Sequence, residues 1–457
     1  MDASQTQSDI AQPKGPQDLR KQILTLAIPV VLEQLLTTLT NMVDMMMVGH
    51  LGSEAVAAVG LSNQPLFLSM AIFMGIGVGT TALVARHTGA RNAEIVESVT
   101  RQSFWVALVS AVVIAYVYYR FAPFIIRAMG AEPTVEPLGI AFMRYSGLGY
   151  VAMQWSQVMS GALRGRGDSM TPLYIGIGIN IVNVILGYSL IYGYLGFPVL
   201  GVVGSALATT TSRLGGAVVY LVILLRSNHP VRLRLASLLR LDFPVMWRVL
   251  RIGLPASGER VLQSMGMILF TRIVAGLGTL SMAAHQITVN AESISYMPAI
   301  GLATAGTALV GQRLGARDDQ GAVSVAKETL RITMIAMASM SLAFFFLGKP
   351  YMSLYTNDLE VRALGVQMLA IAAAAQIPMG ISFAMSGVLR GAGDTLFMMG
   401  VTMIGVWAVR LTITGGLTHY LGWGLAAAWA SMFFDWSFRG ACAYWRFRSG
   451  VWSSVKV

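Results

Sequence analysis

Acidic and polar side chains recur on one face of the first long apolar stretch. At 100° per residue they fall within an arc of about 100°, so one side of a helix there is polar. A charge in hydrocarbon costs a few kcal/mol, so we expect these groups to face a cavity or a partner. A carboxylate in such a cavity takes up and releases a cation or a proton. The residues are Glu33, Thr37, Thr40, Asn41 and Asp44.

Later apolar stretches of the first half add uncharged polar groups that we expect to line the same cavity. Amide and hydroxyl groups also tie membrane helices together, each contributing about 0.6 to 2 kcal/mol, and that alternative stays open for each of them. They are Gln64, which precedes Pro65, then Tyr150, Gln154 and Gln157 on one stripe, and Asn180 and Asn183.

The second half has its own polar stripe, formed by His285, Thr288, Glu292 and Ser295 within an arc of about 80°. Glu259 and Gln263 stand on the preceding stretch. We expect Gln263 and His285 to line the substrate cavity. The acids of this half that we expect to take part in cation coupling, together with Glu33 and Asp44, are Glu259 and Glu292. No group of metal-ligand spacing occurs, and we expect neither a metal nor a cofactor.

The chain repeats itself with a shift of 226 positions. Leu163-Arg164-Gly165, followed by Gly167-Asp168, returns as Leu389-Arg390-Gly391 followed by Gly393-Asp394. Such long registration indicates two homologous units rather than a solenoid. Two acids break the symmetry: Asp44 maps to Phe270, and Glu292 maps to Leu66, whereas Glu33 keeps its counterpart Glu259. Asp44 is therefore specific to the first unit.

Composition indicates a membrane protein: 55% of the residues are hydrophobic and 12% are charged. Apolar stretches of about 20 residues are long enough to span a bilayer. We predict an all-α polytopic fold with twelve transmembrane helices, in two six-helix bundles related by a pseudo-twofold axis along the membrane normal. The predicted spans start near residues 22, 55, 103, 138, 171, 198, 252, 282, 327, 361, 396 and 421.

The predicted organisation follows these spans. Residues 1–20 form a polar tail, 21–226 and 251–446 form the two bundles, 227–250 form a linker, and 447–457 form a second tail. Lys and Arg gather in the tails and in the even-numbered connections, so we expect both termini in the cytoplasm and the chain in the bacterial inner membrane. The positive charge fits anionic lipids as partners. No basic stripe interleaved with aromatics suggests nucleic acid.

Proline and the remaining buried charges invite structural interpretations. Pro29 lies inside the first span, one turn from Glu33, where it should kink the helix and act as a hinge.

Arg410 and Asp435 stand at similar depth on neighbouring spans and are expected to form a structural pair. The sequence assigns no role to Arg144, Arg213 and Arg272. Cys442, the single cysteine, excludes an internal disulfide.

Several motifs together resemble the multidrug and toxic compound extrusion (MATE) family. They are the segment from Pro29 through Asp44 to Gly49, the run Ala283-Ala284-His285-Gln286-Ile287, and the twice-used Leu-Arg-Gly-x-Gly-Asp. The resemblance implies two six-helix lobes that export organic cations in exchange for protons or sodium. It also implies that Asp44 is the coupling aspartate of the first helix.

The chain departs from the family at three positions. Asn180 and Asn183 fit a fifth-span family pattern whose aspartate is replaced by Gly187, so the two-aspartate proton site of some members is incomplete here. Gln263 and Met379 stand where sodium-coupled members carry acids. The resemblance therefore favours protons over sodium.

The expected function is secondary active multidrug efflux of organic cations by antiport against protons, with sodium less favoured. Substrate and proton would compete for one carboxylate, and Met, Tyr and Trp would make the cavity permissive. A lipid-linked sugar flippase of the same superfamily and a dedicated metabolite exporter are the alternatives. A flippase should have a basic cavity, whereas the stripes above are acidic. The chain lacks the motifs G-x-S-x-G, H-E-x-x-H and a phosphate loop, so we do not expect an enzyme.

Topology gives the first prediction. A reporter fused after Arg446 should be active in the cytoplasm, because the arginines and lysines of the tails and even-numbered connections stay on that side. Paired cytoplasmic and periplasmic reporters measure this, with fusions after Arg120 as the control of opposite sign. Activity of the Arg446 fusion outside the cell would contradict the orientation.

Overall fold

The computed structural model describes residues 15–226, 233, 238–420 and 424–455, and these are almost entirely helical. The tails predicted at 1–20 and 447–457 and the linker at 227–250 lie partly outside the described residues. The first half contains α1 (Pro16–Gly49), α2 (Ser53–Gly89), α3 (Ala93–Ala128), α4 (Glu136–Arg166), α5 (Met170–Tyr192) and α6 (Gly201–Leu225).

The second half has the same plan with two interrupted spans. Its elements are α7 (Phe243–Ala275), α8 (Thr279–Ser295), α9 (Met297–Gly315), α10 (Asp319–Tyr355), α11 (Leu359–Ala392), α12 (Thr395–Met403), the π-helix η3 (Ile404–Arg410), α13 (Leu411–Tyr420), α14 (Gly424–Arg448) and the 3₁₀ turn η4 (Val451–Ser454). The pair α8 and α9 and the series α12, η3 and α13 each continue one span. The predicted twelve-helix, two-bundle fold is confirmed.

Helix ends repeat between the halves as closely as the sequence does. The side chain of Asn92 accepts a hydrogen bond from the Ile95 amide at 3.1 Å, and Asp318 accepts one from the Gly321 amide at 2.8 Å. These caps let α3 and α10 begin about two to three turns before the predicted apolar starts, because a capped polar turn needs no hydrocarbon. Hydrophobicity alone therefore places these two starts too late.

Three spans are less apolar than the rest. Nine helices among the described residues are long and apolar enough to cross a membrane by length and composition, and α4, α7 and α14 are not among them. These three carry Arg164, Arg260 and Arg439, respectively. Polar spans of this kind mark the place where a cavity or an ion-pair network lies.

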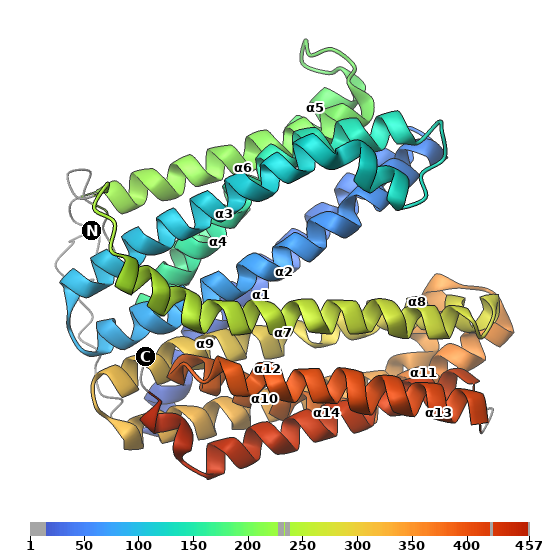
Figure 1. The fold of residues 1–457 in the computed structure, drawn as a ribbon. Coiled ribbons are helices and arrows are strands. Elements are labelled where there is room, and N and C mark those ends of the chain that lie inside the picture. The colour runs from blue at the N-terminus through green and yellow to red at the C-terminus, as the bar shows by residue number, and fades with distance from the viewer. Residues whose placement is uncertain (1–14, 227–232, 234–237, 421–423, 456–457) are drawn as a thin grey trace.

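The two six-helix lobes meet at one end of the molecule and separate toward the other (Figure 1). We call the meeting end, which contains Pro16, Gly89, Phe243 and Gly315, the terminal face. Arg86 donates a hydrogen bond from Nη1 to the Val455 carbonyl oxygen at 3.1 Å, and Arg20 of α1 pairs with Glu328 of α10. Both contacts join one lobe to the other near the terminal face.

Small residues allow the lobes to touch along their backbones. A Cβ added to Gly89 would collide with the Gln312 carbonyl, and one added to Gly315 would collide with the Arg86 carbonyl. These two contacts are equivalent under the 226-residue repeat. Gly79 packs on the α7 backbone in the same way. Close backbone approach supplies the van der Waals contact that holds membrane helices together.

The contact predicts an effect of bulk at Gly89. Valine there should open the lobe interface, because overpacking costs about 1 to 3 kcal/mol, a roughly 5- to 150-fold loss of the closed interface. The readout is labelling of a cysteine at Ala85, which is buried in this interface, by a membrane-impermeant maleimide in a variant without Cys442. Labelling should rise in Gly89→Val.

The matched control is Gly215→Val in α6, where an added side chain meets open space. That variant should leave the labelling of residue 85 unchanged. Equal labelling in the Gly89 variant and its parent would contradict the proposed role of the glycine contact.

Candidate transport cavity

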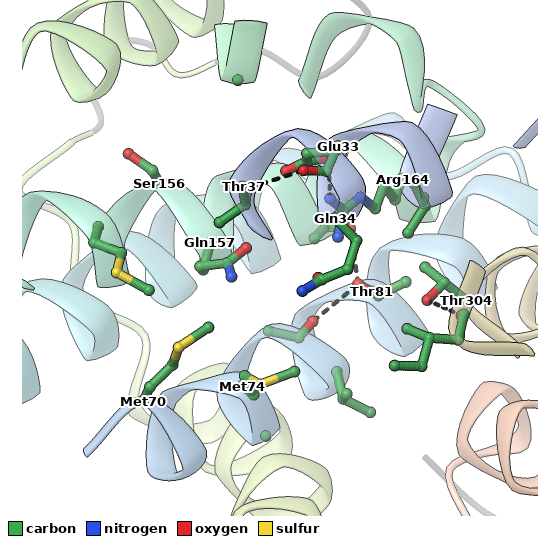
Figure 2. A pocket seen from close by; sticks show the side chains of 18 of the residues that line it. Glu33, Gln34, Thr37, Met70, Met74, Thr81, Ser156, Gln157, Arg164 and Thr304 are labelled. Atoms are coloured by element: carbon green, nitrogen blue, oxygen red, sulfur yellow. Dashed lines mark hydrogen bonds and ion pairs between the residues drawn. The ribbon is translucent and has the colours of Figure 1, made fainter. Parts of the chain in front are cut away.

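A cavity of about 280 Å³ lies between the lobes. Side chains of α1, α2, α4, α5 and α6 form most of its wall, and α7, α9 and α11 close it from the second lobe. Figure 2 shows Glu33 and Thr37 of α1 facing Met70 and Met74 of α2 across it. Lining residues that the sequence singled out are Glu33, Thr37, Thr40, Asn41, Gln157, Asn180 and Asn183.

Five other residues expected in the cavity lie outside its lining: Gln64, Tyr150, Gln154, Gln263 and His285. Gln154 and Tyr150 belong to the buried part of α4, because that helix packs on α2, α3 and α6 and turns only part of its polar stripe inward. His285 lies between the rings of Phe270 and Trp429, with ring centroids 5.7 Å from each. A polar stripe predicted for one helix does not show which of its residues a neighbouring helix covers.

Asp44 lies near the C-terminal end of α1, away from the terminal face, and is half-buried. Its carboxylate faces the Asn183 amide and the Arg213 guanidinium. Gly187 of α5 lies opposite, and a Cβ placed there would be 3.8 Å from Asp44 Oδ1. The residues that the resemblance groups together therefore meet in space, with Gly187 at the position where the resemblance implies an aspartate.

Glu33 and Glu259 occupy equivalent positions and make equivalent ion pairs. Arg164 Nη2 lies 2.5 Å from Glu33 Oε2, and Arg390 Nη2 lies 2.8 Å from Glu259 Oε1. Thr402 also donates to Glu259 Oε1 at 3.2 Å. Both carboxylates are thus held by a guanidinium. A cation-coupling role for them stays a prediction.

The twice-used Leu-Arg-Gly-x-Gly-Asp motif supplies these arginines and ends their helices. Gly167 and Gly393 adopt φ of 101° and 89°, the left-handed conformation that lets a helix stop abruptly. Asp168 then accepts a hydrogen bond from the Thr171 amide at 2.9 Å, at the start of α5. The motif therefore fixes the arginine at the last turn of α4 and α11.

A second charged cluster is fully buried in the second lobe. Asp435 Oδ2 lies 2.7 Å from Arg410 Nη2 and 2.6 Å from Arg439 Nη2, and the exposed fraction of all three side chains is at most 3%. The expected pair of Arg410 and Asp435 is confirmed. Arg410 ends the π-helical segment η3, and π-helical turns occur often at functional sites.

Glu292 of α8 is buried and faces Arg410 and Arg439 electrostatically. Among the residues that the structure describes, neither Glu292 nor Asp44 has an arginine or lysine within ion-pair distance. Glu33, Glu259 and Asp435 do have one. The acids thus divide into three that are paired and two that are not.

The charged groups that line the cavity are mostly basic. Arg164, Arg213, Arg260 and Arg390 line it together with Glu33. The expectation of an acid-rich cavity is therefore wrong for the described residues. Its physical reason is that the acids of the stripes turn toward arginines from other helices, which a helix-by-helix reading does not bring together.

Comparison with known proteins agrees with the two-lobe arrangement. A family model described as MatE matches residues 29–189 and 255–414, one segment in each lobe. The chain belongs to the MatE family. A Thermotoga maritima relative named "Probable multidrug resistance protein NorM" is 30% identical over 445 residues, which cover 96% of this chain and 94% of the relative. A Xylella fastidiosa relative of the same name is 30% identical over 430 residues, covering 93% and 91%.

Solved MatE structures share the fold. The outward-facing conformation of a multidrug resistance MATE family transporter of the MOP superfamily has a TM-score of 0.88 at 23% identity, covering 97% of this chain and 99% of that one. The resemblance to this family, inferred from the motifs, is confirmed. This chain is accordingly a multi-pass membrane protein.

Sequence reasoning left Arg213 unassigned and gave no role to Arg439. Arg213 lies with its guanidinium 5.1 Å from the Tyr150 ring centroid and faces Asp44, and Arg439 lies 3.9 Å from the Trp436 ring centroid. The two arginines are equivalent under the repeat. That coincidence of two intramembrane arginines was the signal that could have found both. No cluster of three metal-ligating side chains occurs in the described ranges.

The buried cluster predicts a stability effect. Asp435→Asn should lower the stability of the detergent-solubilised protein by about 3 to 5 kcal/mol, because it leaves two buried guanidiniums without a carboxylate. Thermal unfolding followed by tryptophan fluorescence measures the loss. Glu136→Gln, which breaks the exposed pair with Arg127, should change stability by about 1 kcal/mol or less. Equal effects of the two variants would contradict the cluster's structural role.

Proposed function

We propose that this MatE member exports small amphipathic drugs, organic cations among them, by antiport against protons, with sodium less favoured. The names of its relatives support drug efflux. The surroundings of Asp44 support a proton as the coupling ion. Asp44 adjoins Asn183, a lining residue of the cavity, and forms no ion pair with the described residues. Arg213 faces this carboxylate but does not lie within ion-pair distance of it, so either a proton or a cationic substrate can neutralise it and the two compete.

The lobe arrangement supports alternating access. With the terminal face in the cytoplasm, the described conformation closes the cavity toward the cytoplasm through the glycine contacts and separates the lobes toward the outside. Protons then reach Asp44 from outside and displace the cation. Pro29 of α1 is the proposed hinge, because Ala27 and Val31 on either side of it touch Gly301 of α9. We place the protein in the bacterial inner membrane, with membrane lipids around its apolar surface.

Three observations argue against sodium. Gln263 and Met379 stand where the resemblance places acids of sodium-coupled members. Glu259, the nearest acid to Gln263 on α7, forms an ion pair with Arg390. In the second lobe, Arg410 and Arg439 both pair with Asp435, so this carboxylate already has two guanidinium counter-ions. Glu292 stays a proposed second cation-coupling residue.

A lipid-linked sugar flippase is the second candidate, because the arginines of the cavity are what such a substrate would require. The cavity volume of about 280 Å³ suits a drug-sized molecule better than a sugar chain. A dedicated metabolite exporter would need a more polar wall than Met70, Met74 and Met153 provide.

Substrate uptake into liposomes tests the proposal. An imposed proton gradient should drive ethidium transport by the wild type, and Asp44→Asn should reduce the rate about tenfold or more, because the amide can neither load a proton nor attract the cation. A sodium gradient alone should give no transport. Glu136→Gln, outside the cavity, should behave as the wild type does.

Wild-type rates in Asp44→Asn would rule out the coupling role. Transport driven by sodium with the proton gradient collapsed would overturn the choice of ion. No transport of any cationic dye would favour the flippase or the metabolite exporter.

A further inference from the structure

Arg260 of α7 is a charged residue of the cavity lining that forms no ion pair with the described residues. Arg164 and Arg390 are paired with Glu33 and Glu259. Arg213 also has no ion pair, but its guanidinium faces Asp44 and lies 5.1 Å from the Tyr150 ring centroid. Within the described part of the chain, Arg260 has neither a hydrogen bond nor an ion pair. A half-buried guanidinium with no partner is costly unless a ligand or water satisfies its five donors.

The neighbours of Arg260 increase its demand for an anion. Glu259 is adjacent in the chain, but its Oε1 already accepts from Arg390 and Thr402. Arg390 lines the same wall and, like Arg439, repels Arg260 electrostatically. The repeat shows that this charge is a feature of the second lobe, because the equivalent residue of α1 is Gln34, which also lines the cavity. The wall near α7 and α11 is therefore positive.

The wall beside Arg260 also offers a flat apolar surface. Phe383 of α11 lines the cavity and stacks on Tyr296 with ring centroids 6.1 Å apart and planes inclined by 18°. Thr304 and Thr307 lie nearby in the lining, but both hydroxyls donate to carbonyls of their own helix. Arg260 is thus a charged group of this wall that has no hydrogen-bond or ion-pair partner among the described residues, beside a ring against which an aromatic ligand can pack.

We propose that Arg260 binds an anionic group, such as a carboxylate, on the exported molecule. This inference rests on the proposed drug efflux and specifies its substrates as amphipathic acids or zwitterions in addition to simple cations. In a zwitterion the acidic group lies against Arg260 in the second lobe and the cationic group lies toward Asp44 in the first. The proton still competes with the cationic group, so antiport by competition holds for both kinds of substrate.

A matched pair of dyes tests the assignment. Rhodamine 110 carries a free carboxylate, and rhodamine 123 is its methyl ester, so the two differ in the group that Arg260 should bind. Fluorescence polarisation with the purified full-length protein measures binding of each. The wild type should bind rhodamine 110 more tightly. Arg260→Gln, which installs the residue of the equivalent position Gln34, should weaken rhodamine 110 binding about tenfold and rhodamine 123 binding by less than about twofold.

Two variants separate recognition from structure. Arg260→Lys keeps the charge and should recover most of the rhodamine 110 affinity, although a lysine lacks the planar fork. Arg272→Gln makes the same change on the same helix at an exposed position outside the cavity lining and should alter neither dye. Thermal unfolding of Arg260→Gln confirms that it is folded.

Equal loss of both dyes in Arg260→Gln, a wild-type preference for the ester, or no binding of rhodamine 110 would each overturn the proposal. Failure of the drug-efflux proposal looks different: a proton gradient would drive neither dye into liposomes, whereas the binding difference between the dyes would persist.

Discussion

A glutamate of the first helix of each lobe pairs with an arginine at the end of the fourth, and the cavity is built around these two ion pairs. Glu33 with Arg164 and Glu259 with Arg390 each join residues 131 positions apart. Losing one partner of such a partly buried pair leaves a charge without its counter-ion, so the pairs help to fix where α1 and α7 lie against α4 and α11. The remaining polar groups of the wall take their places from that arrangement.

The two lobes use one arginine of the sixth span differently. Arg213 and Arg439 are equivalent under the repeat, but the carboxylate each one faces comes from a different helix: Asp44 from α1 in the first lobe, Asp435 from α14 in the second. Phe270 takes the place of Asp44, and its ring lies 5.7 Å from the Arg410 guanidinium. One lobe thus keeps its acid beside the cavity, whereas the other locks its acid in the protein interior. The asymmetry suits one lobe for exchange and the other for rigidity.

The transmembrane spans could be predicted from the sequence, but the ion-pair partners of the acids could not. Hydrophobicity and the 226-residue repeat predict twelve helices because each span must satisfy its own backbone in lipid. The partner of a buried acid is a property of two helices, so the stripe on α1 identified Glu33 but not Arg164. The predicted charge of the cavity lining was wrong for the same reason. Asp44, Glu259 and Glu292 were counted without the arginines that face them.

The glycine contacts at the terminal face are the same on both sides of the pseudo-twofold axis. Gly89 meets Gln312, and Gly315 meets Arg86, so each lobe presents to the other the surface that it receives. An interface of this kind is isologous, the type that two identical subunits form. A single six-helix unit inserted in one orientation could therefore have assembled with a copy of itself through this face before the two copies were joined in one chain. The linker then had only to bridge a dimer that already existed.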